Sequence, residues 1–170
     1  MAAESFDVDS EISPKHRVVA KSVIALIVGS VLLGVIAYLG RDRFTERPNP
    51  TLEMGLMILV LFLGLGSIVW RRTKFSGMRL QDIGALEGPR GLLRTLEKTT
   101  LQLSMFGAAI SILAFLGTLV TGNPGLTYRG IAVALVVLLY SYPTKSSWNR
   151  VVLYYGNPDT PSESNTVNSL

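Results

Sequence analysis

Few residues in this chain could carry out catalysis, and their spacing does not support it. The chain contains no cysteine, which excludes disulfides, thiol catalysis and cysteine-ligated metals. Its single histidine, His16, lies among basic residues, so a histidine-based triad or a histidine metal cluster lacks partners. The acidic residues are scattered. We therefore expect no enzyme activity, no bound cofactor and no metal.

Glu53 is the acidic residue nearest to the interior of a long apolar run. A carboxylate inside a membrane could bind a cation or relay a proton, because ionisable groups there are usually functional. Glu53 instead stands at the entrance of its run, where a helix dipole favours a carboxylate and water is close. We favour this structural interpretation.

A glycine-rich stretch lies beside several arginines, and its sequence is Gly84-Ala-Leu-Glu-Gly88-Pro-Arg-Gly91. Backbone N–H groups in such loops can hold a phosphate. The stretch lacks the Gly-Lys-Ser/Thr of a P-loop, and no strand precedes it as in a Rossmann fold. Neither type of nucleotide-binding site is therefore indicated. We expect a hinge, with Pro89 as the first residue of a new helix. A lipid phosphate at Arg90 is a less specific alternative.

Seven of the 16 lysines and arginines gather between residues 70 and 99. Bases near an anionic membrane surface contribute about 1 kcal/mol each, so this link could contact anionic lipid headgroups or an acidic partner protein. We favour the alternative that loops on one side are basic because basic loops set membrane topology. The seven are Arg71, Arg72, Lys74, Arg79, Arg90, Arg94 and Lys98.

The elements that carry these residues are four apolar runs. Hydrophobic residues make up 48% of the chain, and they gather in blocks nearly free of charge. Residues 22–40 alone would form about 28 Å of uncharged helix, close to the roughly 30 Å of a hydrocarbon core. The predicted fold is an all-α integral membrane protein with four transmembrane helices as two hairpins. The predicted spans are residues 21–40, 53–70, 100–121 and 127–143.

Two of the four runs have alternatives. A cleaved signal peptide is disfavoured for the first, because an acidic tail precedes it and it ends in Tyr38-Leu39-Gly40 rather than a small-residue cleavage site. The uncharged part of the fourth, 130–142, is short for a span. A re-entrant helix or a surface element therefore remains open there.

The link, residues 71–99, should contain a short amphipathic interfacial helix between the second and third spans. Leu80, Ile83 and Leu86 recur there at helical spacing among polar residues. Residues 15–155 form the predicted membrane domain, in which 148–155 look interfacial. The tails, 1–14 and 156–170, should be disordered because they are polar and cannot bury a core.

Basic residues are distributed unequally between the two sides of the predicted bundle. One side carries Lys15, Arg17, Lys21, the seven bases of the link, Lys145 and Arg150, twelve in all. The other carries Arg41, Arg43, Arg47 and Arg129. The positive-inside rule then places both termini and the link in the cytoplasm, or its stromal or matrix equivalent. The expected location is the inner or plasma membrane of the cell.

Small residues inside the spans predict close helix packing. They are Gly29, Ser30 and Gly34 in the first span and Gly107 and Ser111 in the third. Such residues let helix backbones approach in lipid, and they serve internal packing and oligomers equally.

A possible duplication connects the two halves of the chain. Residues 21–40 align without gaps on 98–117, which would make two parallel copies of a helical hairpin. Chance similarity is the alternative, because apolar helices draw on few residue types.

The pattern favours a non-enzymatic accessory, assembly or scaffold component that acts through helix packing and a basic cytoplasmic face. The alternative is a small transporter or channel subunit for a neutral or lipophilic solute, which needs no charge inside a span. The expected partners are a bilayer with anionic lipid headgroups and either a protein partner or further copies of the chain. Nucleic acid is not expected, because the net charge of +4 comes from bases beside apolar runs.

Overall fold

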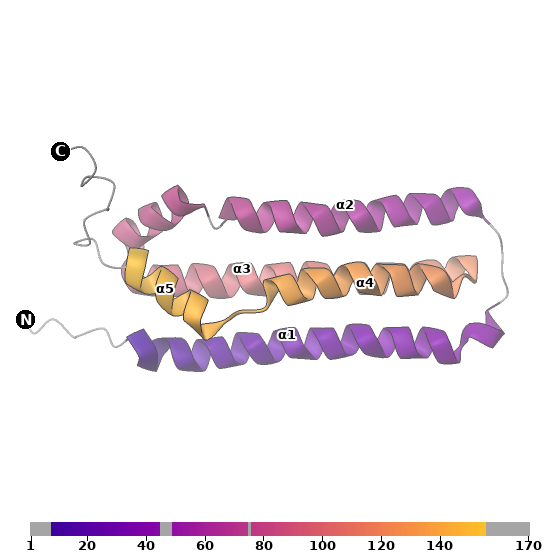
Figure 1. Ribbon diagram of the computed structural model, residues 1–170, viewed down its shortest axis with the longest axis horizontal. Coiled ribbons are helices and arrows are strands. Elements are labelled where there is room, and N and C mark those ends of the chain that lie inside the picture. Colours follow the sequence, from indigo (N-terminus) through magenta and orange to yellow (C-terminus); the bar gives the residue numbers. More distant parts are fainter. Residues whose placement is uncertain (1–7, 45–48, 75, 156–170) are drawn as a thin grey trace, which may run out of the picture.

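The computed structural model describes residues 8–44, 49–74 and 76–155, and the regular elements in these ranges are all helices. In chain order they are α1 (Val8–Leu39), the short 3-10 helix η1 (Arg41–Arg43), α2 (Pro50–Lys74), α3 (Gly77–Thr121), α4 (Pro124–Ser141) and α5 (Lys145–Tyr155) (Figure 1). The helices α1 to α4 are each long and apolar enough to cross a membrane. The predicted all-helical protein with four such helices is confirmed.

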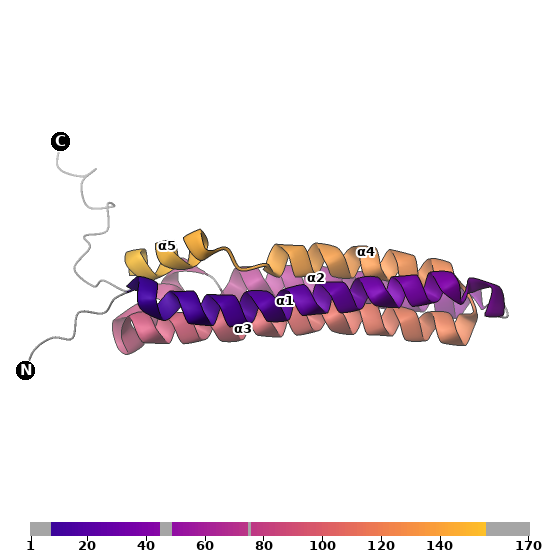
Figure 2. The ribbon, with the colours of Figure 1, turned by 90° about the horizontal axis from the view of Figure 1, so that it is seen from below.

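The helices α3 and α4 form the centre of the bundle, and α4 packs against the second half of α3. The helices α1 and α2 lie on opposite sides of this pair, as two perpendicular views show (Figures 1 and 2). Within the described residues, α1 and α2 make no extended contact with each other. The predicted pairing of the first two helices is therefore wrong. The duplication fails with it, because a repeat would place α1 against α2 as α3 lies against α4.

Small residues allow α3 and α4 to approach closely. Gly130 of α4 lies against Ala114, and Gly107 of α3 lies against Leu138, with no room for a side chain at either glycine. The turn between the helices is equally tight. Gly122 ends α3 with φ 75°, in the left-handed region that glycine adopts without a Cβ clash. Asn123 then caps α4.

A second core lies beyond the end of α4. It contains Ile12, Val19 and Val23 of α1, Leu93 and Leu96 of α3, and Trp148 and Val152 of α5. We call this part the head. The other core, between the long helices, contains Val60, Ile110, Ala134 and Val137. The helix α1 is 32 residues long, about 48 Å, so it spans the long bundle and also enters the head.

The head corrects one prediction. Residues 8–14, expected in a disordered tail, are the first turns of α1, and Ile12 is fully buried because it meets apolar side chains of the head. Trp148, which belongs to the predicted interfacial stretch 148–155, is only 3% exposed and packs in the same core. Residues 1–7 and 156–170, the rest of the predicted tails, lie outside the described residues.

The helix α3 bends at the predicted hinge. Gly88 has φ 65° and ψ −165°, and Pro89 follows it. Residues 77–87, which we call the arm, therefore leave the axis of α3 (Figure 1). On the arm Leu80 is 3% exposed whereas Leu86 is 86% exposed, so these two leucines do not share one buried face. Gly84 of the arm packs against the backbone of Tyr155, at the end of α5.

Candidate functional site

Hydroxyl groups inside the bundle bond to one another across helices. The Ser111 hydroxyl of α3 donates to Ser30 Oγ of α1 over 2.8 Å. The hydroxyls of Thr118 and Thr127 lie 2.6 Å apart between α3 and α4. Such pairs keep each buried hydroxyl satisfied and hold the helices in register.

The residues predicted for helix packing divide into two sets. Ser30, Ser111 and Gly107 face other helices of the bundle, and a Cβ on Gly34 would lie 3.0 Å from a side-chain carbon of Ile131. Gly29 differs, because a Cβ built on it would meet no atom within 4 Å. It therefore points away from the rest of the bundle.

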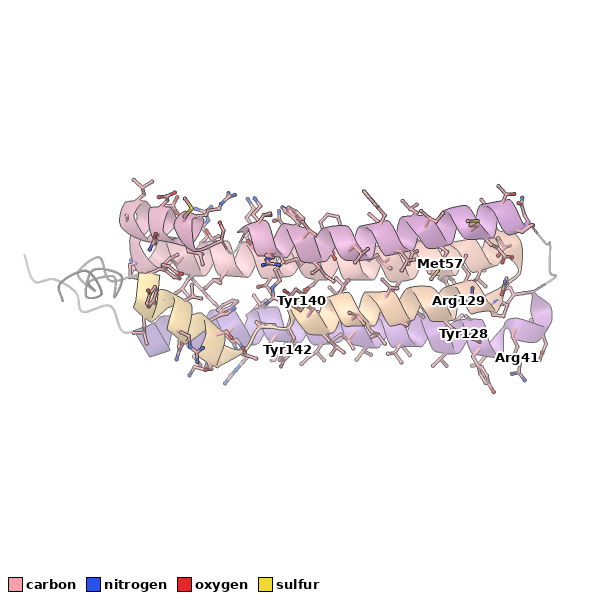
Figure 3. The ribbon with its side chains drawn as sticks, turned by 45° about the horizontal axis from the view of Figure 1, so that its top comes forward. Arg41, Met57, Tyr128, Arg129, Tyr140 and Tyr142 are labelled. Atoms are coloured by element: carbon pink, nitrogen blue, oxygen red, sulfur yellow. The ribbon has the colours of Figure 1, made fainter. Side chains whose placement is uncertain are left out.

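Glu53 lies in a small polar cleft at the end of the bundle opposite the head. The cleft has a volume of about 310 Å³ and is lined by Pro50, Glu53, Met54, Met57, Asn123, Leu126 and Arg129. Met57 and Arg129 mark it between α2 and α4 (Figure 3). A carboxylate of α2 and a guanidinium of α4 therefore line the same cleft.

Asn123 connects this cleft to the α3–α4 turn. Its side-chain Nδ2 donates to Glu53 Oε2 over 2.9 Å, and its Oδ1 accepts from the Gly125 backbone N–H. Its backbone carbonyl accepts from the Thr118 hydroxyl. Glu53 thus ties the start of α2 to the turn, as expected for a carboxylate in the first turn of a helix rather than inside a span.

The seven bases of the link are spread over several surfaces of the head end. The Arg71 guanidinium lies 4.3 Å from the ring centroid of Tyr140, a cation–π contact between α2 and α4. Tyr140 and Tyr142 mark this end of α4 (Figure 3). Arg79 lies on the arm, whereas Arg94 and Lys98 stand one turn apart on α3. Exposed bases among the seven are Arg72, Arg79, Arg90, Arg94 and Lys98.

A groove of about 410 Å³ opens between α2 and α3 near the head, lined by Trp70, Gln102, Met105, Phe106 and Ala109. The rings of Trp70 and Phe106 meet edge to face with centroids 5.1 Å apart. Sequence analysis missed this groove because it needs two helices to be neighbours. One signal was present, since Lys98, Gln102, Met105 and Ala109 recur along α3 at the spacing of a single helix face.

His16 has a structural position in the head. Its Nε2 lies 3.0 Å from the Pro143 carbonyl oxygen, and its ring meets Trp148 edge to face at 5.7 Å. It thereby links α1 to the connection between α4 and α5. In the part of the chain that the structure describes, no group of three or more histidine, aspartate or glutamate side chains could hold a metal ion.

Comparison with known protein families, curated proteins and solved structures finds no match to this chain.

Proposed function

We propose that this chain is a multi-pass membrane protein that acts as a non-enzymatic accessory, assembly or scaffold component. The observation that carries the proposal is an uncovered stripe on α2. Gly55, Leu59, Phe62 and Gly66 follow one another at spacings of four, three and four residues, which places them on one face. The Phe62 side chain is 74% exposed, and a Cβ on either glycine would meet no atom within 4 Å.

This α2 stripe has the composition of a helix-packing surface. In lipid, helices associate through close van der Waals contact, so recesses at glycines beside a large side chain favour a partner helix. The outer helices α1 and α2 are also less buried than α3 and α4. In their most apolar 18-residue windows, 17% of α1 and of α2 is buried, against 44% of α3 and of α4.

The head supplies the second contact surface of the proposal. Twelve bases belong to the head end, against Arg41, Arg43 and Arg129 among the described residues of the other end. The positive-inside rule then puts the head in the cytoplasm or its equivalent, with the chain in an inner or plasma membrane. Exposed Met78 and Leu86 on the arm suit an interfacial position beside anionic headgroups.

The alternative function is a small transporter or channel subunit for a neutral or lipophilic solute. The cleft with Glu53 and Arg129 favours it, because polar groups there could receive a solute. The close approach of Gly107 to Leu138 and of Gly130 to Ala114 counts against a path between α3 and α4. A pathway would therefore have to run elsewhere than between α3 and α4.

Purification in mild detergent followed by mass spectrometry tests the proposal. The wild-type chain should retain a second protein, and Gly55→Leu with Gly66→Leu should lower its yield about tenfold, as a loss of about 1.4 kcal/mol would. Gly29→Leu is the matched control, because it adds the same side chain at an equally open site on α1. Recovery of the wild-type chain alone would contradict an accessory function.

A further inference from the structure

The α2–α3 groove has an ordered sequence of chemical groups along its length. The helices are antiparallel, and Trp70 of α2 meets Phe106 of α3 across the groove. Met105 and Ala109 continue the apolar wall toward the bundle centre. From Gln102 to Ala109 the wall extends about 10 Å along α3.

Two lysines stand at the head end of this groove. Lys74 follows Trp70 by one turn of α2, and its Nζ lies 5.9 Å from the Trp70 ring centroid. Lys98 precedes Gln102 by one turn of α3 and is exposed. Each is about 6 Å from the groove residue of its own helix, measured along the helix axis. The Lys74 ammonium thus lies beside the Trp70 side of the groove, and Lys98 stands one turn nearer the head than Gln102 on α3.

Gln102 lies between Lys98 and the apolar wall along α3. Its side chain is half-buried and lines the groove, so its amide N–H groups can donate to an acceptor inside it. Along α3 the order from the head inward is therefore a cation, an amide donor and an apolar wall, and α2 adds a second cation, Lys74, one turn from Trp70. A glycerophospholipid has the matching order of phosphate, ester carbonyl and acyl chain.

We propose that this groove binds one anionic glycerophospholipid of the leaflet on the head side. Lys74 and Lys98 contact its phosphate, Gln102 donates to an ester carbonyl, and an acyl chain packs against Trp70, Met105, Phe106 and Ala109. Charge complementarity selects this occupant over a second apolar helix, which would leave both cations without an anion. The site stands independently of the protein partner proposed for the α2 stripe.

The two tryptophans of the chain allow a direct test. Trp148 is buried in the head, so Trp148→Phe leaves Trp70 as a single reporter in the groove. This protein is placed in phosphatidylcholine vesicles that contain either phosphatidylglycerol or phosphatidylcholine with brominated acyl chains, which quench tryptophan on contact. Phosphatidylglycerol should bind beside Trp70 at least fivefold more tightly than phosphatidylcholine, the ratio expected from about one favourable base contact.

Charge variants separate a defined site from the general charge of the head. In the same background, Lys74→Gln with Lys98→Gln should bring the ratio of the two lipids close to one. Arg17→Gln with Arg79→Gln is the matched control, because it removes two exposed bases of the same end outside the groove and should leave the ratio unchanged. Ala109→Phe, at an exposed lining position, should fill the groove and reduce quenching by both lipids.

Three results would overturn the proposal. Equal quenching by the two brominated lipids would remove the preference for an anionic headgroup. An equal loss of preference in the control variant would assign it to the overall charge of the head. Absence of quenching by either lipid would mean that protein, a second copy or another chain, covers the groove.

Discussion

Gly88 is the position where one residue type decides the course of the backbone. Its φ of 65° with ψ of −165° lies in a region that essentially only glycine occupies, because a Cβ would strain the chain. The bend sends the arm toward α5 and lets Pro89 begin the straight part of α3 without losing a helical hydrogen bond. The direction of the arm therefore depends on this residue.

Replacing Gly88 by alanine should destabilise the protein by about 1–3 kcal/mol, the strain of that backbone region. Space is not the cause, because no atom lies within 4 Å of the added Cβ. Gly55→Ala is the control, since Gly55 has equal space but lies inside α2, where alanine is neutral or favourable by up to about 1 kcal/mol. Unfolding by SDS titration in mild detergent measures the stabilities of both variants. Equal stability of the two variants would contradict a conformational requirement at Gly88.

At the scale of elements, α5 holds the head together. It contacts α1 and α3, and its Trp148 and Val152 enter a core shared by all three helices. His16 meets the Trp148 ring edge to face and makes a polar contact with the Pro143 carbonyl oxygen. The position of the first turns of α1 thus depends on a helix more than a hundred residues later in the chain.

Trp148→Ala should loosen the head while the long bundle stays folded. Removal of a buried aromatic side chain costs about 3–5 kcal/mol, and the loss falls on the head because α1, α3 and α5 share that core. Amide hydrogen exchange should rise in residues 12–23 and stay unchanged in α4. Tyr154→Ala, an exposed aromatic of the same helix, should leave both segments unchanged. An equal rise in exchange in residues 12–23 and in α4 of the Trp148 variant would argue against a separate head core.

For the whole molecule, the two ends differ in both size and charge. The head end carries its own core and most of the bases, whereas the other end has short connections and the cleft at Glu53. Such an asymmetry favours one orientation of the chain in the membrane, because moving many bases across the bilayer costs more than moving few.

The proposed orientation predicts opposite labelling of cysteines placed at two aspartate positions. The chain has no cysteine, so Asp42→Cys in η1 and Asp82→Cys in the arm each create a single thiol. A membrane-impermeant maleimide should label the first in intact cells and the second only after permeabilisation. Tenfold or greater selectivity is expected, because the reagent does not cross the bilayer. The reverse labelling pattern would invert the orientation.

The sequence by itself determined the features that depend on local composition. The four long apolar helices follow from uncharged runs of bilayer length, and the bend follows from Gly88-Pro89. The unequal charge of the ends is also a property of the sequence alone.

Only the tertiary structure decided which helices are neighbours. In lipid the inward and outward faces of a helix are both apolar, so hydrophobicity does not say which side packs. Fit at small residues, as at Gly107 and Gly130, and the bond between Ser30 and Ser111 make that choice. The separation of α1 from α2, the burial of Trp148 and the groove beside Trp70 could therefore not be predicted, since each needs contacts between residues distant in the sequence.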